Sequence, residues 1–228
     1  MAAELDGPRL NPRSGPARQL VVFLHGYGAD GKDLIEIGRE WQRLLPNAAF
    51  VSPHAPEACS QAPTGRQWFP LYTGDVNERW NGVNKAAPVF DRFLDAELKR
   101  HDLPASALGL VGFSQGTMMA LHAGLRRAQP PVAIVGYSGT FVLPHNAAPD
   151  AVASEIRSRP PVLLIHGDRD DLIPPQALFH ATAALAALEV PVEWHLSTGI
   201  GHGIDPEGLR QGGEFLARLL TGRRPKPA

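Results

Sequence analysis

A serine held between two glycines offers the clearest chemistry in the chain. Residues 112–116 read Gly-Phe-Ser-Gln-Gly, which is the G-x-S-x-G pattern of a nucleophile elbow. An apolar run at 108–111 precedes this pentapeptide and a helix-like stretch at 117–125 follows it. The two glycines are required because a Cβ at either position would strike the neighbouring strand or helix of so tight a turn. We therefore predict that Ser114 is a nucleophile.

An orienting acid is expected after a later apolar run, 161–165, which leads into His-Gly-Asp-Arg-Asp-Asp at 166–171. Catalytic groups gather at the carboxyl ends of parallel strands. We predict that Asp170 is the acid, because it lies three residues after a glycine and four before the proline that begins the next helix. Asp171 stays open as the alternative, and Asp168 is expected to bind backbone N–H groups within its own turn.

The general base is expected in the loop after the last predicted strand, 192–196. His202 lies there between two glycines, where its ring can turn back over the edge of the sheet. His195 lies inside the strand, which is more typical of a packed or paired histidine, and is the second choice. Ser114, Asp170 and His202 then follow the Ser…Asp…His order of the α/β-hydrolases.

The glycine-rich loop after the first strand has two interpretations. Residues Gly26–Lys32 nearly match a phosphate-binding loop, so a nucleotide-binding protein is the alternative from a different class. Asp33 stands where that loop needs a serine or threonine, and no acid ends the next strand. We therefore expect the backbone N–H groups of Tyr27 and Gln115 to form an oxyanion hole. His25 is expected to anchor this loop.

Aromatic residues are concentrated in a long segment, 53–81, that has little regular periodicity. Long segments of this kind inside a compact domain are usually functional. We predict that Trp68, Phe69 and Tyr72 bind substrate, whereas Trp80 is expected to pin the loop to the core.

Unbroken apolar runs, such as 19–24 and 161–165, predict strands buried on both faces of a parallel sheet. Helical patterns between them predict an α/β fold, with a mostly parallel central sheet and helices on both faces. The expected organisation is a flexible lead-in at 1–18, a single domain at 19–220 and a basic tail at 221–228.

Composition narrows the function classes. A net charge of −1 over 228 residues gives no field that attracts nucleic acid or an anionic membrane. Cys59 is the only cysteine, so no internal disulfide can form, and the sequence shows no secretory signal and no apolar run near the ~20 residues of a membrane span. These features predict a cytoplasmic protein without stable membrane insertion. A homodimer stays open.

Five motifs together resemble the phospholipase/carboxylesterase family, which includes the acyl-protein thioesterases. They are Leu24-His-Gly-Tyr-Gly, Pro53-His-Ala-Pro, Gly112-Phe-Ser-Gln-Gly, His166-Gly-Asp-Arg-Asp and Gly201-His202. The resemblance implies a single domain with the α/β-hydrolase fold and no large cap. It also implies a cofactor-free carboxylesterase acting on short- to medium-chain esters, with thioesters of proteins and lysophospholipids as alternatives. It also implies Ser114, Asp170 and His202 as the triad and Tyr27 and Gln115 as oxyanion donors.

The sequence departs from this family where Trp68-Phe69 is followed by Pro70, since the family commonly has an acid there. A rival nucleophile, Ser138, lacks the second glycine of an elbow. Dienelactone hydrolases are disfavoured because the elbow carries serine in place of cysteine, and a non-catalytic binding protein would not need three triad members. No H-E-x-x-H motif or Cys/His cluster predicts a metal site.

Overall fold

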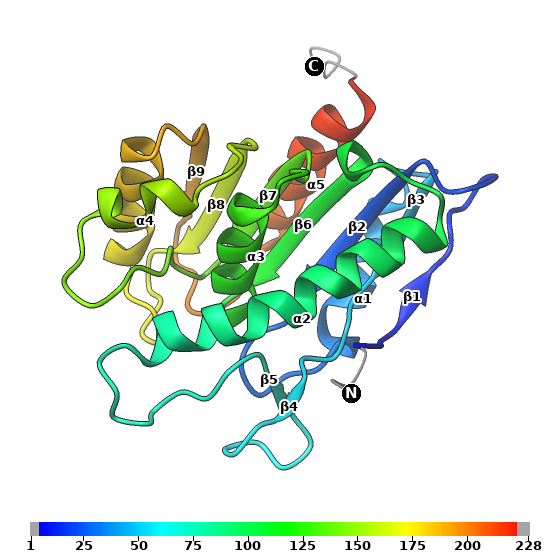
Figure 1. The fold of residues 1–228 in the computed structure, drawn as a ribbon. Coiled ribbons are helices and arrows are strands. Elements are labelled where there is room, and N and C mark those ends of the chain that lie inside the picture. Colours follow the sequence, from blue (N-terminus) through cyan, green and yellow to red (C-terminus); the bar gives the residue numbers. More distant parts are fainter. Residues whose placement is uncertain (1–4, 223–228) are drawn as a thin grey trace.

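A central seven-stranded sheet forms the core of the computed structural model, which describes residues 5–222 (Figure 1). The strand order is β1-β3-β2-β6-β7-β8-β9, and every neighbouring pair is parallel except β1 with β3. The strands are β1 (Arg9–Leu10), β2 (Gln19–Leu24), β3 (Ala48–Val51), β6 (Leu108–Phe113), β7 (Ala133–Tyr137), β8 (Val162–Gly167) and β9 (Val192–Ser197).

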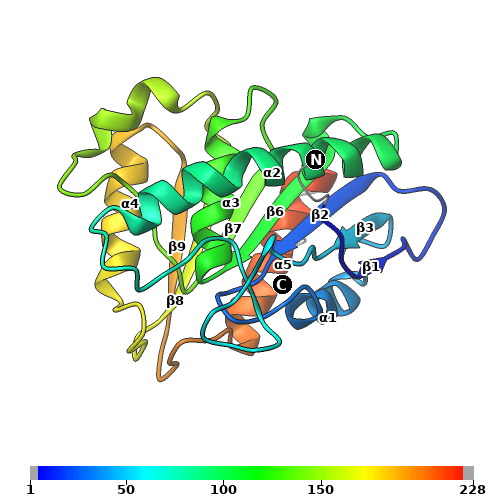
Figure 2. The ribbon, with the colours of Figure 1, turned by 60° about the horizontal axis from the view of Figure 1, so that its bottom comes forward.

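Helices cover both faces of this sheet (Figures 1 and 2). Two hydrophobic clusters separate the faces: α2, α3 and α4 pack into one, and α1 and α5 pack into the other. The helices are α1 (Lys32–Trp41), α2 (Glu78–Arg100), α3 (Gln115–Arg126), α4 (Gln176–Ala187) and α5 (Pro206–Thr221). The predicted fold, a mostly parallel sheet between two helical layers, is confirmed.

The central strands lack polar and apolar alternation because both of their faces are covered. Every residue of β7 is buried, and so is every residue of β8. Parallel strands of this kind end at one edge of the sheet, where loops can bring distant residues together. β6 and β8 point toward the lower part of Figure 1, where the small antiparallel hairpin of β4 (Glu57–Ala58) and β5 (Arg66–Gln67) also lies.

A short strand lies within the segment 1–18, which was expected to be a flexible lead-in. Arg9 and Leu10 of β1 pair antiparallel with Val51 and Phe50 of β3. The Arg9 guanidinium also binds the buried carboxylate of Glu97, with Nη2 2.7 Å from Oε1. A two-residue strand held by contacts distant in sequence leaves no periodic pattern to recognise. Residues 1–4 and, in the predicted basic tail, 223–228 lie outside the described residues.

The helical spacing of apolar residues predicts a helix over about 83–101, and in the structure this helix, α2, begins earlier, at Glu78. The Glu78 carboxylate accepts hydrogen bonds from the backbone N–H and the hydroxyl of Thr73, so the preceding loop is tied to the first helical turn. Two 3₁₀ segments, Ala105–Ala107 and Pro149–Glu155, complete the regular structure. Over residues 5–222, every helix is too short or too polar to cross a bilayer.

Candidate active site

Ser114 occupies a sharp turn between β6 and α3. Its φ of 53° and ψ of −115° are unfavourable for a residue with a side chain, and such strain persists only where surrounding structure enforces it. The Ser114 N–H donates to the carbonyl of Tyr137 at 2.9 Å, which ties the turn to the end of β7. Thr117 fastens the start of α3 to the same carbonyl through its hydroxyl. The serine is therefore held in the conformation of a nucleophile elbow.

The glycines around Ser114 are required by close backbone contacts. A Cβ at Gly112 would lie 2.4 Å from the carbonyl oxygen of Gly116, and a Cβ at Gly116 would lie 1.8 Å from that of Leu24. Both distances are far below any van der Waals contact. The steric reason given for the G-x-S-x-G pattern is thus visible in the structure.

Asp170 and His202 come together from two different loops. His202 Nδ1 lies 2.8 Å from Asp170 Oδ2, which is hydrogen-bond distance. The other carboxylate oxygen, Oδ1, accepts from the N–H groups of Leu172 and Ile173 at 3.0 and 2.9 Å. Asp171, the alternative acid, is exposed on the same turn. Asp170 is therefore the aspartate that contacts a histidine of the predicted site.

His202 also lies beside the elbow, since its ring centroid is 5.0 Å from that of Phe113, the residue before the serine. In the described part of the chain, no hydrogen bond joins Ser114 to His202. Catalytic hydrogen bonds are often long in ligand-free enzymes and shorten when substrate binds.

The loop that carries His202 is fixed by contacts with segments that are distant in sequence. Asp168 accepts from the Gly199 N–H at 2.6 Å, and the Arg169 N–H donates to Ile200 at 2.9 Å. A Cβ at Gly167 would lie 2.3 Å from the Ile200 oxygen, so only glycine lets the two loops approach. The Ser138 hydroxyl donates to the Gly203 carbonyl at 3.2 Å, which makes the rival serine an anchor of this loop.

The predicted oxyanion donors lie on either side of Ser114. Gln115 is the first residue of α3, and the first N–H groups of a helix have no partner within the helix. Across residues 5–222, neither the Tyr27 N–H nor the Gln115 N–H donates to a backbone acceptor outside regular structure. A Cβ built on Gly26 would lie 3.4 Å from the Ser114 Cβ, so the Tyr27 loop runs directly beside the serine.

His25 anchors this loop, as expected. Its Nε2 accepts from the Ala55 N–H at 3.0 Å, and its Nδ1 then donates to the Gly26 carbonyl at 2.8 Å. Burial lowers the pKa of His25 to about 4, so the ring is neutral at physiological pH. A neutral ring suits this pair of contacts, because it has one donor and one acceptor.

The Gly26–Lys32 loop is not built to hold a phosphate. Three of its N–H groups already donate to acceptors of the protein: that of Gly28 to the Arg66 carbonyl, that of Gly31 to His54, and that of Lys32 to Asp30. A phosphate-binding loop leaves such groups free. This geometry contradicts the nucleotide-binding alternative. Among residues 5–222, no group of three or more His, Cys, Asp or Glu side chains is arranged to hold a metal ion.

Trp68 and Phe69, expected to bind substrate, are instead core residues with at most 1 % of their surface exposed. The Trp68 indole donates to the His25 carbonyl and packs edge-on against Phe90. The Gln115 side chain clamps this segment, because it accepts from the Trp68 N–H and donates to the Phe69 carbonyl at 2.9 and 2.8 Å. The two rings therefore fix the loop that borders the oxyanion donors.

Tyr72 is the exception among the three predicted substrate-binding aromatics, since 71 % of its surface is exposed. Its ring packs edge-on against that of Tyr27, with centroids 6.1 Å apart. Its φ of 63° is unusual for a residue with a bulky side chain. Tyr72 thus lies at the surface beside the oxyanion loop.

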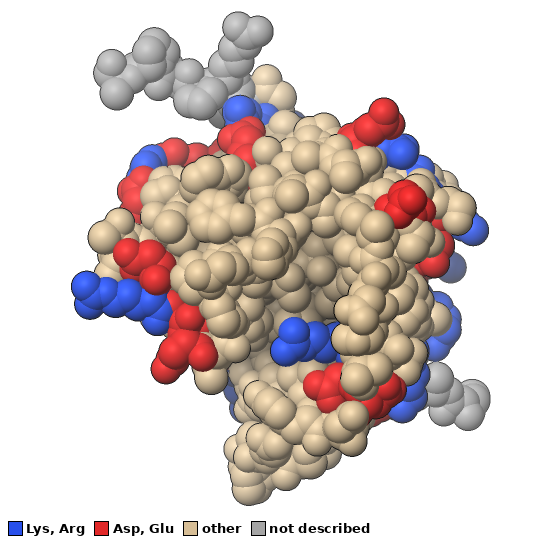
Figure 3. Space-filling view, turned by 90° about the vertical axis from the view of Figure 1, so that its left-hand side faces the viewer, with Lys and Arg blue, Asp and Glu red and all other residues tan. Residues whose placement is uncertain are grey.

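A groove of about 400 Å³ lies between residues 75–80 and 140–146. One of its two lining segments begins at Thr140, directly after Gly139. A Cβ at Gly139 would lie 2.9 Å from the Ser114 carbonyl oxygen, so this segment starts beside the elbow. Trp80, which was expected only to pin the loop, lines this groove and packs edge-on against His122. Figure 3 views the side of the molecule that carries these segments. This face is hollowed near its centre, with uncharged side chains above the hollow and basic and acidic side chains at its lower edge.

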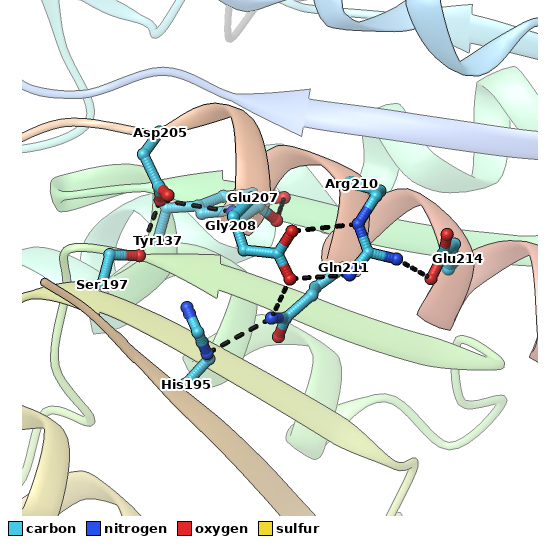
Figure 4. Close-up of polar contacts among 9 residues, drawn as sticks. All are labelled: Tyr137, His195, Ser197, Asp205, Glu207, Gly208, Arg210, Gln211 and Glu214. Carbon is cyan, nitrogen blue, oxygen red and sulfur yellow. Dashed lines mark hydrogen bonds and ion pairs between the residues drawn. The ribbon is translucent and has the colours of Figure 1, made fainter.

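His195 lies in a separate polar network between β9 and α5 (Figure 4). The Gln211 amide nitrogen is 3.3 Å from its Nδ1 and donates to Glu207 at 2.7 Å. In the same region Asp205 caps α5, because its carboxylate accepts from the Gly208 N–H and from the Ser197 hydroxyl. Among the described residues, His195 makes no hydrogen bond to either Ser114 or Asp170.

Comparison with known proteins places this site in a family. The sequence model of the Phospholipase/Carboxylesterase family matches residues 5–220. The esterase YpfH of Escherichia coli is 32% identical over 201 residues, which cover 86% of this chain and 80% of that protein. Acyl-protein thioesterase 1 of Gibberella zeae is 28% identical over 225 residues, covering 93% and 95%.

Solved structures agree with the sequence comparison. The crystal structure of esterase PE8 has 43% sequence identity and a TM-score of 0.89, and the match covers 96% of this chain and all 100% of that one. The carboxylesterase of Bacillus cereus shares the fold, with a TM-score of 0.73 at 15% identity, over 95% of each chain. The chain belongs to the phospholipase/carboxylesterase family of α/β-hydrolases, which are enzymes that hydrolyse ester bonds.

Proposed function

We propose that the protein is a serine carboxylesterase that hydrolyses short- to medium-chain esters through Ser114, Asp170 and His202. The observation that supports this most directly is the 2.8 Å contact between His202 Nδ1 and Asp170 Oδ2, beside a serine in the strained elbow conformation. Because Nδ1 faces the carboxylate, Nε2 is the nitrogen free to take a proton from the serine.

The mechanism follows from these positions. His202 accepts the Ser114 proton as the hydroxyl oxygen attacks the ester carbonyl, and Asp170 stabilises the imidazolium that forms. The N–H groups of Tyr27 and Gln115 bind the resulting oxyanion, each contributing about 3 kcal/mol. His202 then gives its proton to the departing alcohol, and water repeats the sequence on the acyl-enzyme to release the acid.

We assign the acyl chain to the groove between residues 75–80 and 140–146. Val76, Trp80 and Leu143 supply the apolar part of its lining, and about 400 Å³ suits a short or medium chain. Each methylene that leaves water contributes about 0.8 kcal/mol. Hydrolysis of p-nitrophenyl acetate, butyrate, octanoate and palmitate tests the proposal; a folded protein that cleaves none of them would contradict it.

A bulky substitution in the groove is expected to change the chain-length profile. Thr140→Trp fills the groove beside the elbow, so kcat/KM for the octanoate ester falls about tenfold or more relative to the acetate ester, the loss expected from two displaced methylenes. Thr64→Trp is the matched control, since Thr64 is exposed and lies outside the groove. An equal loss for both esters in Thr140→Trp would place the acyl chain elsewhere.

A thioesterase is the second candidate, because the relative in Gibberella zeae is named an acyl-protein thioesterase. The two activities are distinguished by kcat/KM for an S-octanoyl thioester and an O-octanoyl ester that differ only in the sulfur or oxygen atom of the bond that is cleaved. A cytoplasmic location is also proposed, because the single cysteine, Cys59, allows no internal disulfide. Association into a homodimer stays a prediction.

A further inference from the structure

A second histidine lies against the carboxylate of Asp170. His166, near the end of β8, is 1 % exposed, and its Nε2 lies 3.1 Å from Asp170 Oδ2. The same Nε2 is 2.8 Å from the carbonyl oxygen of Ile173. The proposed mechanism gives His166 no step, although it is one of two histidines within ion-pair distance of the same carboxylate oxygen.

The two oxygens beside Nε2 indicate which ring nitrogen of His166 carries a proton. Its Nε2 faces two oxygens, one from the Ile173 carbonyl and one from the Asp170 carboxylate. A bare lone pair there would be repelled by both, so this nitrogen carries a proton. The N–H points at Ile173, and its positive edge lies beside Oδ2.

The backbone of Ile173 connects this contact to the proposed acid from the other side. Its N–H donates to Asp170 Oδ1 at 2.9 Å, while its carbonyl accepts from His166. His166 therefore holds the turn of residues 170–173 to the rigid end of β8. Catalytic groups need such support, because a misplacement of about 1 Å costs roughly a hundredfold in rate.

We propose that His166 is a positioning residue, which holds the Asp170 carboxylate in line with His202 and stabilises its negative charge. This inference rests on the proposed triad. His166 does not touch the reacting atoms in that mechanism; it acts through Asp170 alone. Its effect must therefore disappear when the carboxylate is removed.

The charged groups around Asp170 make the expected pH effect specific. Within the described chain, the ionisable side chains within ion-pair distance of Asp170 are His166, on the strand before it, and His202, on the loop after β9. Asp168 of the same turn is bound to the Gly199 N–H, and Asp205 is bound at the start of α5. The His166 N–H offsets part of the negative charge of Asp170. Without it, the carboxylate attracts the imidazolium of His202 more strongly. The acid limb of the kcat/KM profile then moves to higher pH.

The test compares three substitutions of His166 by kcat, KM and the pH profile for p-nitrophenyl butyrate. His166→Leu is expected to lower kcat about tenfold or more with little change in KM, and to move the acid limb upward. His166→Gln, whose amide reaches the position of Nε2, is expected to retain the natural profile. His166→Asn, whose amide falls short, is expected to behave as His166→Leu does, which keeps the test valid if the leucine variant does not fold.

A double-substitution cycle separates this inference from the proposed triad. In an Asp170→Asn background, His166→Leu is expected to have almost no further effect on kcat. An undiminished effect there, or an unmoved acid limb in both His166→Leu and His166→Asn, would overturn the positioning role while leaving the triad intact. A fully active Asp170→Asn enzyme would instead reject the proposed triad.

Discussion

Replacement of His202 by alanine is expected to lower kcat for p-nitrophenyl butyrate about a million-fold. The proposed mechanism passes every proton through this imidazole, and loss of the base from comparable triads removes nearly all of the catalysis that the triad provides. KM is expected to change much less, because the groove and the oxyanion donors are untouched. Steady-state kinetics on protein shown to be folded by circular dichroism measures both quantities.

His195→Ala is the matched control for this experiment. His195 lies on β9, and its hydrogen-bond partner is Gln211. Among the described residues it makes no hydrogen bond to Asp170. The control enzyme is therefore expected to keep nearly the natural kcat. Full activity in His202→Ala together with inactivity in His195→Ala would transfer the role of the base to the strand histidine.

Replacement of Asp170 by asparagine is expected to lower kcat about ten-thousand-fold. The amide keeps the shape of the side chain but removes the charge that stabilises the imidazolium, and its NH₂ group favours the wrong tautomer of His202. Asp171→Asn is the matched control, because Asp171 is the exposed neighbour of Asp170 on the same turn. Asp171→Asn is expected to leave kcat within about twofold, as exposed substitutions away from a site usually do.

The reverse outcome would assign the acid differently. If Asp171→Asn abolished hydrolysis and Asp170→Asn preserved it, the 2.8 Å contact between Asp170 and His202 would have no catalytic meaning. Equal small losses in both variants would contradict a triad that includes either aspartate.

The parts of the fold that could be predicted are those with strong local patterns. The unbroken apolar runs predicted the central strands, and every residue of β7 and β8 is indeed buried. Strand β1 could not be predicted, because two residues pair with β3 only through contacts distant in sequence. The start of α2 was also missed, since its first turn depends on the Thr73 contacts of Glu78.

The aromatic loop shows why substrate-binding residues are harder to predict than elements. Trp68 and Phe69 differ from Trp80 in burial, and burial is decided by tertiary packing rather than by residue type. The Gln115 clamp and the anchors provided by Asp168 and Ser138 were likewise not identified, because each joins loops that are distant in sequence. Asp170 was distinguished only by its spacing from a glycine and a proline.

The most direct test of the proposed mechanism is the site at which an irreversible fluorophosphonate reacts. The phosphorus is attacked by the activated serine and fluoride leaves, so one adduct per chain marks the nucleophile. Peptide mapping by mass spectrometry is expected to find the adduct on Ser114, with labelling lost in Ser114→Ala and strongly slowed in His202→Ala. An adduct on Ser138, or inactivation that leaves Ser114 unmodified, would contradict the proposed nucleophile.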